Sequence, residues 1–322
     1  MNGHSGNGVW KGFYRSSDGI FDGYLICTDC DGTLTDSQSE LSDENIEAIR
    51  YFQKEGGLFT LATGRYPKYV NRFKDQFDPN TYLVMGNGTM LLAPVKAEGI
   101  EKGQFSPSYE EPVLIREIVF PKTPREEVLF MVEECGCEVM FTDLRNRSES
   151  WMAKEGNAFW NNVLQETEHD LEKWFSRLDE RYQEWKVHPN DLTHAVLPHK
   201  VIFVFDTPEK TLQAKKMAME RFPEGDFERS WPTGLELLSP GAGKGNAVCF
   251  LREVLEKEGR PVKKLICAGD FENDISMIKA ADMGYAVANA TPDCKEAADR
   301  VTVSCDENAI AVIIRELEEE MG

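Results

Sequence analysis

The sequence has no apolar run that approaches the roughly 20 residues needed to span a lipid bilayer. Its first residues have no basic stretch leading into an apolar one, so no export signal is predicted. Basic residues are also few, because 36 lysines and arginines stand against 56 aspartates and glutamates, a net charge of -20. Such a charge repels polyanions. We therefore expect a cytoplasmic protein with no nucleic acid or membrane partner, which binds a small anion only in a local basic pocket.

Patterns for metal or redox chemistry at histidine and cysteine are scarce. The five histidines form no H-E-x-x-H motif. Cys27 and Cys30 match C-x-x-C, but residues three apart on a strand point to opposite faces, so their thiols would diverge. Cys27, Cys249 and Cys267 lie in apolar runs, where free cysteine packs as a small hydrophobe. We therefore expect free thiols in a reducing compartment.

The 322 residues, 41% of them hydrophobic, divide by texture into three parts. Residues 1–20 are rich in Gly, Ser and Asn and predict a loosely ordered extension. Residues 21–91 and 237–322 alternate strand and helix patterns, which predicts one α/β core with a parallel sheet built from both ends of the chain. Residues 92–236 mix strand-rich segments with helical ones and predict an inserted α+β domain.

The expected elements follow from hydrophobic periodicity and from punctuation by glycine and proline. In the two outer parts, Ser42 before an acid-rich turn marks the start of a helix. The expected strands are 24–28, 58–62, 82–85, 115–120, 138–141, 200–205, 264–268, 285–287 and 300–303. The expected helices are 41–55, 67–77, 124–134, 208–221, 247–258, 274–281 and 307–321.

Two carboxylates follow the first strand, in the segment Asp29-Cys30-Asp31-Gly32-Thr33. The carboxyl end of a strand is where open α/β sheets bind their ligands, and residues two apart in an extended segment share a face. Asp29 and Asp31 therefore converge. The alternative is a turn stabilised by aspartate hydrogen bonds to the backbone, without chemistry. Cys30 between them should point away and pack.

Thr63 and Gly64 end the second strand and offer a hydroxyl and a backbone N–H to an oxyanion. Lys244 adds a cation among glycines just before a helix; otherwise it is a solvated loop lysine. A Walker A loop is disfavoured, because Ser239 and Gly245 stand where that motif needs Gly and Ser or Thr. Arg65 fits either a substrate contact or a surface ion pair.

A fourth group of polar residues, Gly269-Asp270-Phe271-Glu272-Asn273-Asp274, follows the strand 264–268. Clustered carboxylates repel one another and persist most naturally around a hard divalent cation. Oxygen ligands of this kind suit Mg²⁺.

In their order and spacing these four groups resemble the motifs of the haloacid dehalogenase (HAD) superfamily. The long insertion, the Gly86-Asn87-Gly88 turn and the complete last motif are similar to those of its Cof-like branch of sugar-phosphate and cofactor-phosphate phosphatases. The resemblance covers residues 22–92 and 236–322. It implies a Rossmann-like hydrolase core under an α+β cap, and a Mg²⁺-dependent phosphatase that acts on a small phosphorylated metabolite.

The resemblance also implies roles for individual residues. Asp29 would be the nucleophile that forms an aspartyl-phosphate, and Asp31 the general acid and base. Asp29, Asp31 through its backbone carbonyl, and Asp270 would hold Mg²⁺. The remaining members of the motifs would bind the phosphate (Thr63, Gly64, Lys244 and Asn273) or support the metal site from behind (Asp274).

Three other functions use some of the same residues. A phosphomutase of the superfamily would share every motif and return the phosphoryl group to a sugar. A non-catalytic sugar-phosphate sensor should have lost Asp29 or Asp31, and both are present. A P-loop kinase is opposed by Ser239 and Gly245.

Overall fold

The computed structural model describes residues 19–65, 73, 76, 79–96, 107–142, 148–151, 166–168, 173, 175–176, 179–180, 183 and 199–321. The expected N-terminal extension, 1–20, and the expected helix 67–77 lie almost entirely outside these residues. Among the helices of the described part, none is long and apolar enough to cross a membrane.

The strands and helices follow in chain order. They are β1 (Tyr24–Thr28), α1 (Asp43–Lys54), β2 (Leu58–Leu61), β3 (Leu83–Met85), β4 (Met90–Lys96), β5 (Pro107–Glu117), α3 (Arg125–Glu133), β6 (Glu138–Thr142), β7 (Ser148–Trp151), β8 (Glu166–Glu168), β9 (Lys200–Val204), α5 (Pro208–Arg221), β10 (Asp226–Trp231), β11 (Gly234–Leu238), α6 (Lys244–Lys257), β12 (Lys264–Gly269), α7 (Ile275–Ala280), β13 (Met283–Ala286), α8 (Pro292–Ala297), β14 (Arg300–Val301) and α9 (Ala309–Glu319).

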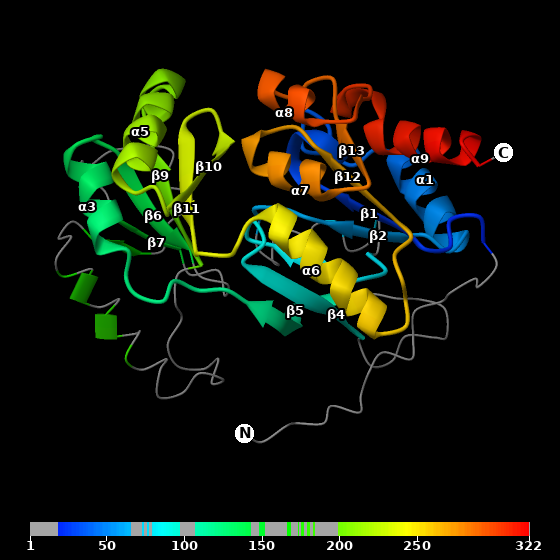
Figure 1. Ribbon diagram of the computed structural model, residues 1–322, viewed down its shortest axis with the longest axis horizontal. Coiled ribbons are helices and arrows are strands. Elements are labelled where there is room, and N and C mark those ends of the chain that lie inside the picture. Colours follow the sequence, from blue (N-terminus) through cyan, green and yellow to red (C-terminus); the bar gives the residue numbers. More distant parts are fainter. Residues whose placement is uncertain are drawn as a thin grey trace.

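The first sheet has the strand order β14-β13-β12-β1-β2, and every pair in it is parallel. β1 lies between β2, its neighbour in sequence, and β12, which comes from the far end of the chain. The prediction of one parallel α/β core built from both ends is therefore confirmed. Figure 1 shows this sheet with α1 and α6 to α9 in one lobe of the molecule.

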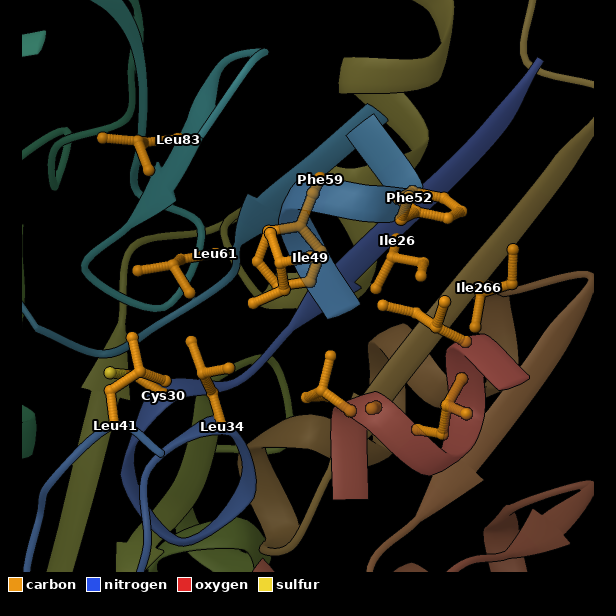
Figure 2. Close-up of a cluster of buried hydrophobic side chains, with 14 of the residues drawn as sticks. Ile26, Cys30, Leu34, Leu41, Ile49, Phe52, Phe59, Leu61, Leu83 and Ile266 are labelled. Atoms are coloured by element: carbon orange, nitrogen blue, oxygen red, sulfur yellow. The ribbon is translucent and has the colours of Figure 1, made fainter. Parts of the chain in front are cut away.

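Helices cover both faces of the first sheet because its strands alternate buried side chains between two clusters. Ile26 and Phe59 pack with Ile49 and Phe52 of α1 and with apolar residues of α9; Figure 2 shows this cluster. Leu25 and other residues of the opposite face pack with α6 and α7. β1, β12 and most of β2 and β13 are buried on both sides, whereas the edge strand β14 is partly exposed.

The strand expected at 82–85 forms, but its main pairing lies outside the parallel sheet. β3 pairs antiparallel with β4, and β4 with β5, in a separate three-stranded sheet. One isolated parallel bridge, Ala62 to Val84, links β3 to the end of β2. The chain reverses after β3 because Gly86, Asn87 and Gly88 all have positive φ. β4 runs through residue 91, and the domain boundaries near 91 and 237 stay a prediction.

The second sheet has the order β10-β11-β9-β6-β7-β8 and forms the other lobe together with α3 and α5 (Figure 1). Its buried cluster joins Val201 and Phe203 of β9 to α3 and α5. The expected strand 200–205 and helices 124–134 and 208–221 are present within a residue or so. β7, β8, β10 and β11 were not predicted. Phe227, Leu235 and Leu237 of the last two strands pack in the same cluster.

A local signal sets the start of α1, whereas the start of α6 is shifted in a way that matters for the site. Ser42 caps α1 by accepting a hydrogen bond from the Asn45 N–H at 3.2 Å, as expected. α6 begins at Lys244 rather than at residue 247, with Gly243 at φ +95 before it. All eight cysteines are free thiols. Cys249 is exposed, contrary to expectation, because it lies on the outer side of α6.

Candidate active site

Three parallel strands end side by side at one edge of the first sheet. The Cα register pairs Thr28, the last residue of β1, with residues at the ends of β12 and β2. Beyond these ends the chain continues into Asp29, Thr63 and Asp270, and the Asp29 N–H still donates to a β12 carbonyl at 2.9 Å. The parallel sheet thus brings together motifs that lie up to 241 positions apart in sequence.

Lys244 is the cation at the centre of the site. Its Nζ donates to Asp29 Oδ1 and to Asp274 Oδ1, each at 2.6 Å, and its side chain is fully buried. Burial by itself would lower the pKa of Lys244, but the carboxylates of Asp274 and Asp29 raise it above its usual value. The interpretation as a solvated loop lysine is wrong, because α6 starts early enough to carry Lys244 inward.

Asp29, Asp270 and Asp274 form a carboxylate cluster in which one oxygen of each lies within 4.8 Å of the others. Burial raises the pKa of Asp29 to about 7, the negative charge of Asp274 adds to this, and Lys244 opposes it. Burial, followed by Asp274 and Asp29, raises the pKa of Asp270 to about 8. The ionised forms of Asp29 and Asp270 are thus unfavourable so close to each other and to Asp274. A divalent cation bound between them would stabilise these ionised forms.

Asp274 differs from the other two acids because both of its oxygens are engaged. Oδ1 accepts from Lys244, and Oδ2 accepts from the backbone N–H groups of Asp270 at 3.0 Å and Phe271 at 3.2 Å. The fit is close, since a Cβ on Gly269 would stand 2.3 Å from the Asp274 Cβ. Asp274 therefore shapes the loop that carries Asp270.

The turn after Asp29 approaches Asp270 closely. Thr33 Oγ1 donates to Asp270 Oδ1 at 3.2 Å. Gly32 has φ +76, and a Cβ there would stand 2.9 Å from Asp270 Oδ2. Asn289 Nδ2 donates to the Gly32 carbonyl at 2.8 Å. The glycine thus supplies both the left-handed backbone and the space that Asp270 occupies.

Asp31 lies at the outer side of this turn, paired with Arg65. Arg65 Nε donates to Asp31 Oδ2 at 2.9 Å, and a terminal nitrogen donates to Oδ1 at 3.3 Å. The Asp31 side chain is 34% exposed and that of Arg65 51%. Asp31 is therefore the more accessible of the two motif aspartates, Asp29 and Asp31. Cys30 between the two aspartates is buried among apolar side chains (Figure 2).

Thr63 and Gly64 form a tight corner beyond β2. Thr63 is buried, and its Oγ1 accepts the Arg65 N–H at 3.1 Å. The Gly64 carbonyl accepts from Lys200 Nζ at 3.1 Å. A Cβ on Gly64 would stand 2.9 Å from Asn87 Oδ1, so only glycine fits this corner without a shift. Lys200 belongs to β9 of the second sheet.

Asn273 is held by a residue to which no role was assigned from the sequence. Its Nδ2 donates to Asn87 Oδ1 at 3.1 Å. Asn87 Nδ2 in turn donates to Glu236 Oε2 at 2.7 Å, and Glu236 is ion-paired with Lys200 at 2.7 Å. Burial lowers the pKa of Lys200, and the charge of Glu236 opposes that change.

Lys200 and Glu236 were missed: Lys200 begins an apolar segment that was interpreted only as a strand, and Glu236 lies in β11, which was not predicted. The signal was present: in KVIFV and GLELL, one charged residue interrupts or begins a run of buried side chains. Charges in such places are costly unless paired, so their presence predicts a buried partner.

A second contact joins the two lobes at the last motif. Glu272 accepts from Arg229 Nε at 2.8 Å and from the Arg229 N–H at 3.1 Å, and it is paired with Lys215 of α5. Burial would raise the pKa of Glu272, but its hydrogen bonds to Lys215 and Arg229 hold it below the usual value. The loop that carries Asp270 is therefore tied directly to the second sheet.

The chain is similar in sequence to known hydrolases and phosphatases. The model of the haloacid dehalogenase-like hydrolase family matches residues 26–314. The putative phosphatase YxeH of Bacillus subtilis is 29% identical over 301 residues, which cover 91% of this chain and 97% of YxeH. YcsE of the same organism, a 5-amino-6-(5-phospho-D-ribitylamino)uracil phosphatase, is 24% identical over 90% of this chain and 94% of its own.

A solved structure gives the same fold. The HAD subclass IIB sugar phosphatase BT4131 superposes with a TM-score of 0.64 at 20% sequence identity, covering 92% of this chain and 99% of BT4131. The likeness extends over both lobes, because nearly all of each chain is matched. It therefore supports an α/β core with an inserted second domain as the fold class.

Proposed function

The chain belongs to the haloacid dehalogenase-like hydrolase family and is a phosphatase, and we propose that it hydrolyses small phosphate monoesters through an aspartyl-phosphate at Asp29, with Mg²⁺ bound beside it. The observation that carries the proposal is the buried ammonium of Lys244, 2.6 Å from both Asp29 and Asp274. Lys244 lowers the pKa of Asp29 against the effect of burial, and an ionised Asp29 is what a nucleophile requires.

The reaction takes two steps. In the first, a carboxylate oxygen of Asp29 bonds to phosphorus, the bond to the leaving oxygen breaks, and protonated Asp31 gives that oxygen its proton. In the second, Asp31 takes a proton from water as the water attacks phosphorus, which frees phosphate and restores Asp29. Arg65 occupies both oxygens of Asp31, so this exposed ion pair has to open before Asp31 can donate.

The donor set of the carboxylate cluster fits Mg²⁺. Asp29 and Asp270 are hard oxygen ligands with raised pKa values, and a cation would stabilise their ionised forms. We assign these two carboxylates and the backbone carbonyl of Asp31 as the ligands, with Asp274 in support. When bound, the ion neutralises negative charge on the phosphoryl group and on the attacking carboxylate.

The phosphoryl oxygens would be held by Thr63, Gly64, Lys244 and Asn273. Thr63 and Gly64 stand at the end of β2, next to β1; Thr63 offers a hydroxyl and Gly64 a backbone N–H, since the Thr63 N–H donates to the Val84 carbonyl. Lys244 supplies a fixed cation already in contact with Asp29. Donors fixed before the reaction stabilise the transition state without reorganising, which accounts for much of an enzyme's rate enhancement.

The substrate class we propose is a sugar phosphate or a cofactor phosphate. The matches to a ribitylaminouracil-phosphate phosphatase and to a sugar phosphatase support this class as a whole and favour neither a sugar phosphate nor a cofactor phosphate. The net charge of -20 favours a small anion drawn to a local cation over a large polyanion.

The test is a phosphate-release screen over sugar phosphates, flavin mononucleotide and pyridoxal phosphate, with Mg²⁺ and with EDTA. We expect Mg²⁺-dependent release that Asp29→Asn abolishes. Asp293→Asn, on the exposed start of α8, is the matched control and should keep full activity. If a hexose phosphate yields an isomeric phosphate and no inorganic phosphate, the enzyme is a mutase and the proposal is wrong.

A further inference from the structure

Asn87 is fully buried, and its backbone and side chain make hydrogen bonds to Thr63, to Asn273 and to the residue before Lys244. Its N–H donates to the Thr63 carbonyl at 3.0 Å, and its carbonyl accepts the Gly243 N–H at 3.0 Å. Its Oδ1 accepts from Asn273 at 3.1 Å. Thr63, the start of α6 with Lys244, and Asn273 are thus each one hydrogen bond from the same residue.

The backbone of this residue is as constrained as its side chain. Asn87 has φ +55, a left-handed conformation that asparagine tolerates better than most residues. The next residue, Gly88, has φ +83, and a Cβ on it would stand 2.2 Å from the Gly243 carbonyl. The turn therefore packs directly against the residue that precedes Lys244.

The second sheet fixes the direction in which the Asn87 amide points. Its Nδ2 donates to Glu236 Oε2 at 2.7 Å and to Ser230 Oγ at 3.1 Å, both on the β10–β11 pair. The carboxylate of Glu236 accepts only, so the amide nitrogen has to face it and the amide oxygen has to face Asn273. Glu236 is itself held by Lys200, whose Nζ also reaches the Gly64 carbonyl at 3.1 Å.

We propose that Asn87 is a positioning residue for phosphoryl transfer, which sets Thr63, Lys244 and Asn273 in register, and that the Lys200–Glu236 ion pair of the second sheet holds Asn87 in the orientation this requires. The inference rests on the proposed function, since it takes those three residues as the phosphate-binding groups. It follows that the phosphate site is complete only when β9 and β11 are seated against it. A site assembled in this way couples turnover to the placement of the second lobe.

The first experiment compares Asn87→Gly with Asn80→Gly. Glycine keeps the positive φ of residue 87 and removes only its amide. Asn80 also bridges buried backbone, accepting from Phe59 N–H and donating to the Gly57 carbonyl, but it lies away from the site. We expect N87G to lose about 100-fold in kcat, the effect of a small misplacement of catalytic groups. N80G should lose stability while kcat stays at the wild-type value.

The readouts separate positioning from simple loss of stability. Binding of orthovanadate, which adopts the geometry of the transition state, should weaken in N87G far more than binding of inorganic phosphate. Both are measured by calorimetry below the unfolding temperature, so they do not depend on turnover. A residue with only a structural role would leave the ratio of the two affinities unchanged.

The second experiment exchanges the two partners across the 2.7 Å contact. N87D alone sets two carboxylates against each other, and E236Q alone deprives Lys200 of its counter-charge. The double variant N87D/E236Q restores an amide facing a carboxylate and the same total charge. We expect it to recover about 10-fold of the vanadate affinity lost in N87D, in line with coupling energies of contacting residues.

Equal vanadate-to-phosphate affinity ratios in N87G, N80G and the wild type would overturn the inference, as would a double variant no better than N87D. Failure of the proposed function looks different. In that case the wild type releases no phosphate, or D29N remains active, whatever residue 87 is. An active wild type with an inactive D29N and an unaffected N87G would reject only the positioning role.

Discussion

Replacing Lys244 with methionine should be among the most destabilising single changes in this protein. Methionine keeps the length of the side chain and removes the ammonium that contacts Asp29 and Asp274, whose side chains are 10% and 1% exposed. Removing one partner of a buried ion pair leaves the other charge without compensation and costs about 3–5 kcal/mol. We expect a loss of unfolding free energy of that size near neutral pH without a metal ion.

The loss of unfolding free energy in K244M should also depend on pH and should be larger at higher pH. In the wild type the pKa of Asp29 is raised to about 7, and removing Lys244 raises it further. Above about pH 7 the folded variant then holds a proton that the unfolded chain has lost, so its stability falls by up to about 1.4 kcal/mol per pH unit. The wild type has largely released that proton there. The difference between them therefore grows with pH.

Urea denaturation in EDTA at about pH 6, 7 and 8 measures both effects. Lys257→Met, at the other end of α6, is the matched control because Lys257 is 75% exposed. It should change stability by less than about 0.5 kcal/mol at every pH. A loss below about 1 kcal/mol in K244M, or a loss that does not increase above pH 7, would refute the assignment of Lys244 as the buried counter-charge.

Two further predictions concern Glu228 and Gly32. Burial, then Asp226 and Glu236, raise the pKa of Glu228 to about 8, so the folded protein loses stability as pH rises from about 4.5 to about 8. E228Q should remove the Glu228 contribution to this slope and gain on the order of 2 kcal/mol over the wild type at alkaline pH, since the side chain is partly exposed; parallel pH–stability curves would contradict this. G32A should displace Asp270, because its Cβ would stand 2.9 Å from Asp270 Oδ2. We expect it to need more Mg²⁺ for half-maximal activity, and an unchanged Mg²⁺ titration would count against Asp270 as a ligand.

The parallel core could be predicted from the sequence because its signals are local. Apolar runs such as 24–28 and 264–268 become β1 and β12, and Ser42 caps α1 as its position before acidic residues indicated. The same local signals predicted the fold class, which is confirmed. The strand 82–85 meets the parallel sheet only through the bridge from Ala62 to Val84; its main pairing is antiparallel to β4, because three consecutive residues from Gly86 to Gly88 have positive φ.

The site could be predicted only where a side chain stands at a strand end. Asp29 and Asp270 follow apolar strands, so their convergence follows from the parallel sheet. The burial of Lys244 could not be foreseen, because it depends on α6 beginning at that residue. Lys200 and Glu236 lie 36 positions apart and reach the site from the second sheet, and no local pattern places them there. The roles of the motif residues, the Mg²⁺ ion and a cytoplasmic location remain predictions.

The most direct test of the central claim is to trap the phosphoryl group on the enzyme. Asp31→Asn removes the base that activates water, and p-nitrophenyl phosphate has a leaving group that needs no proton. Mixed with this substrate and Mg²⁺ and then quenched in acid, D31N should carry one added phosphoryl group, and peptide mass spectrometry should place it on Asp29. A phosphoryl group on any other residue, or rapid turnover by D29N, would contradict the account.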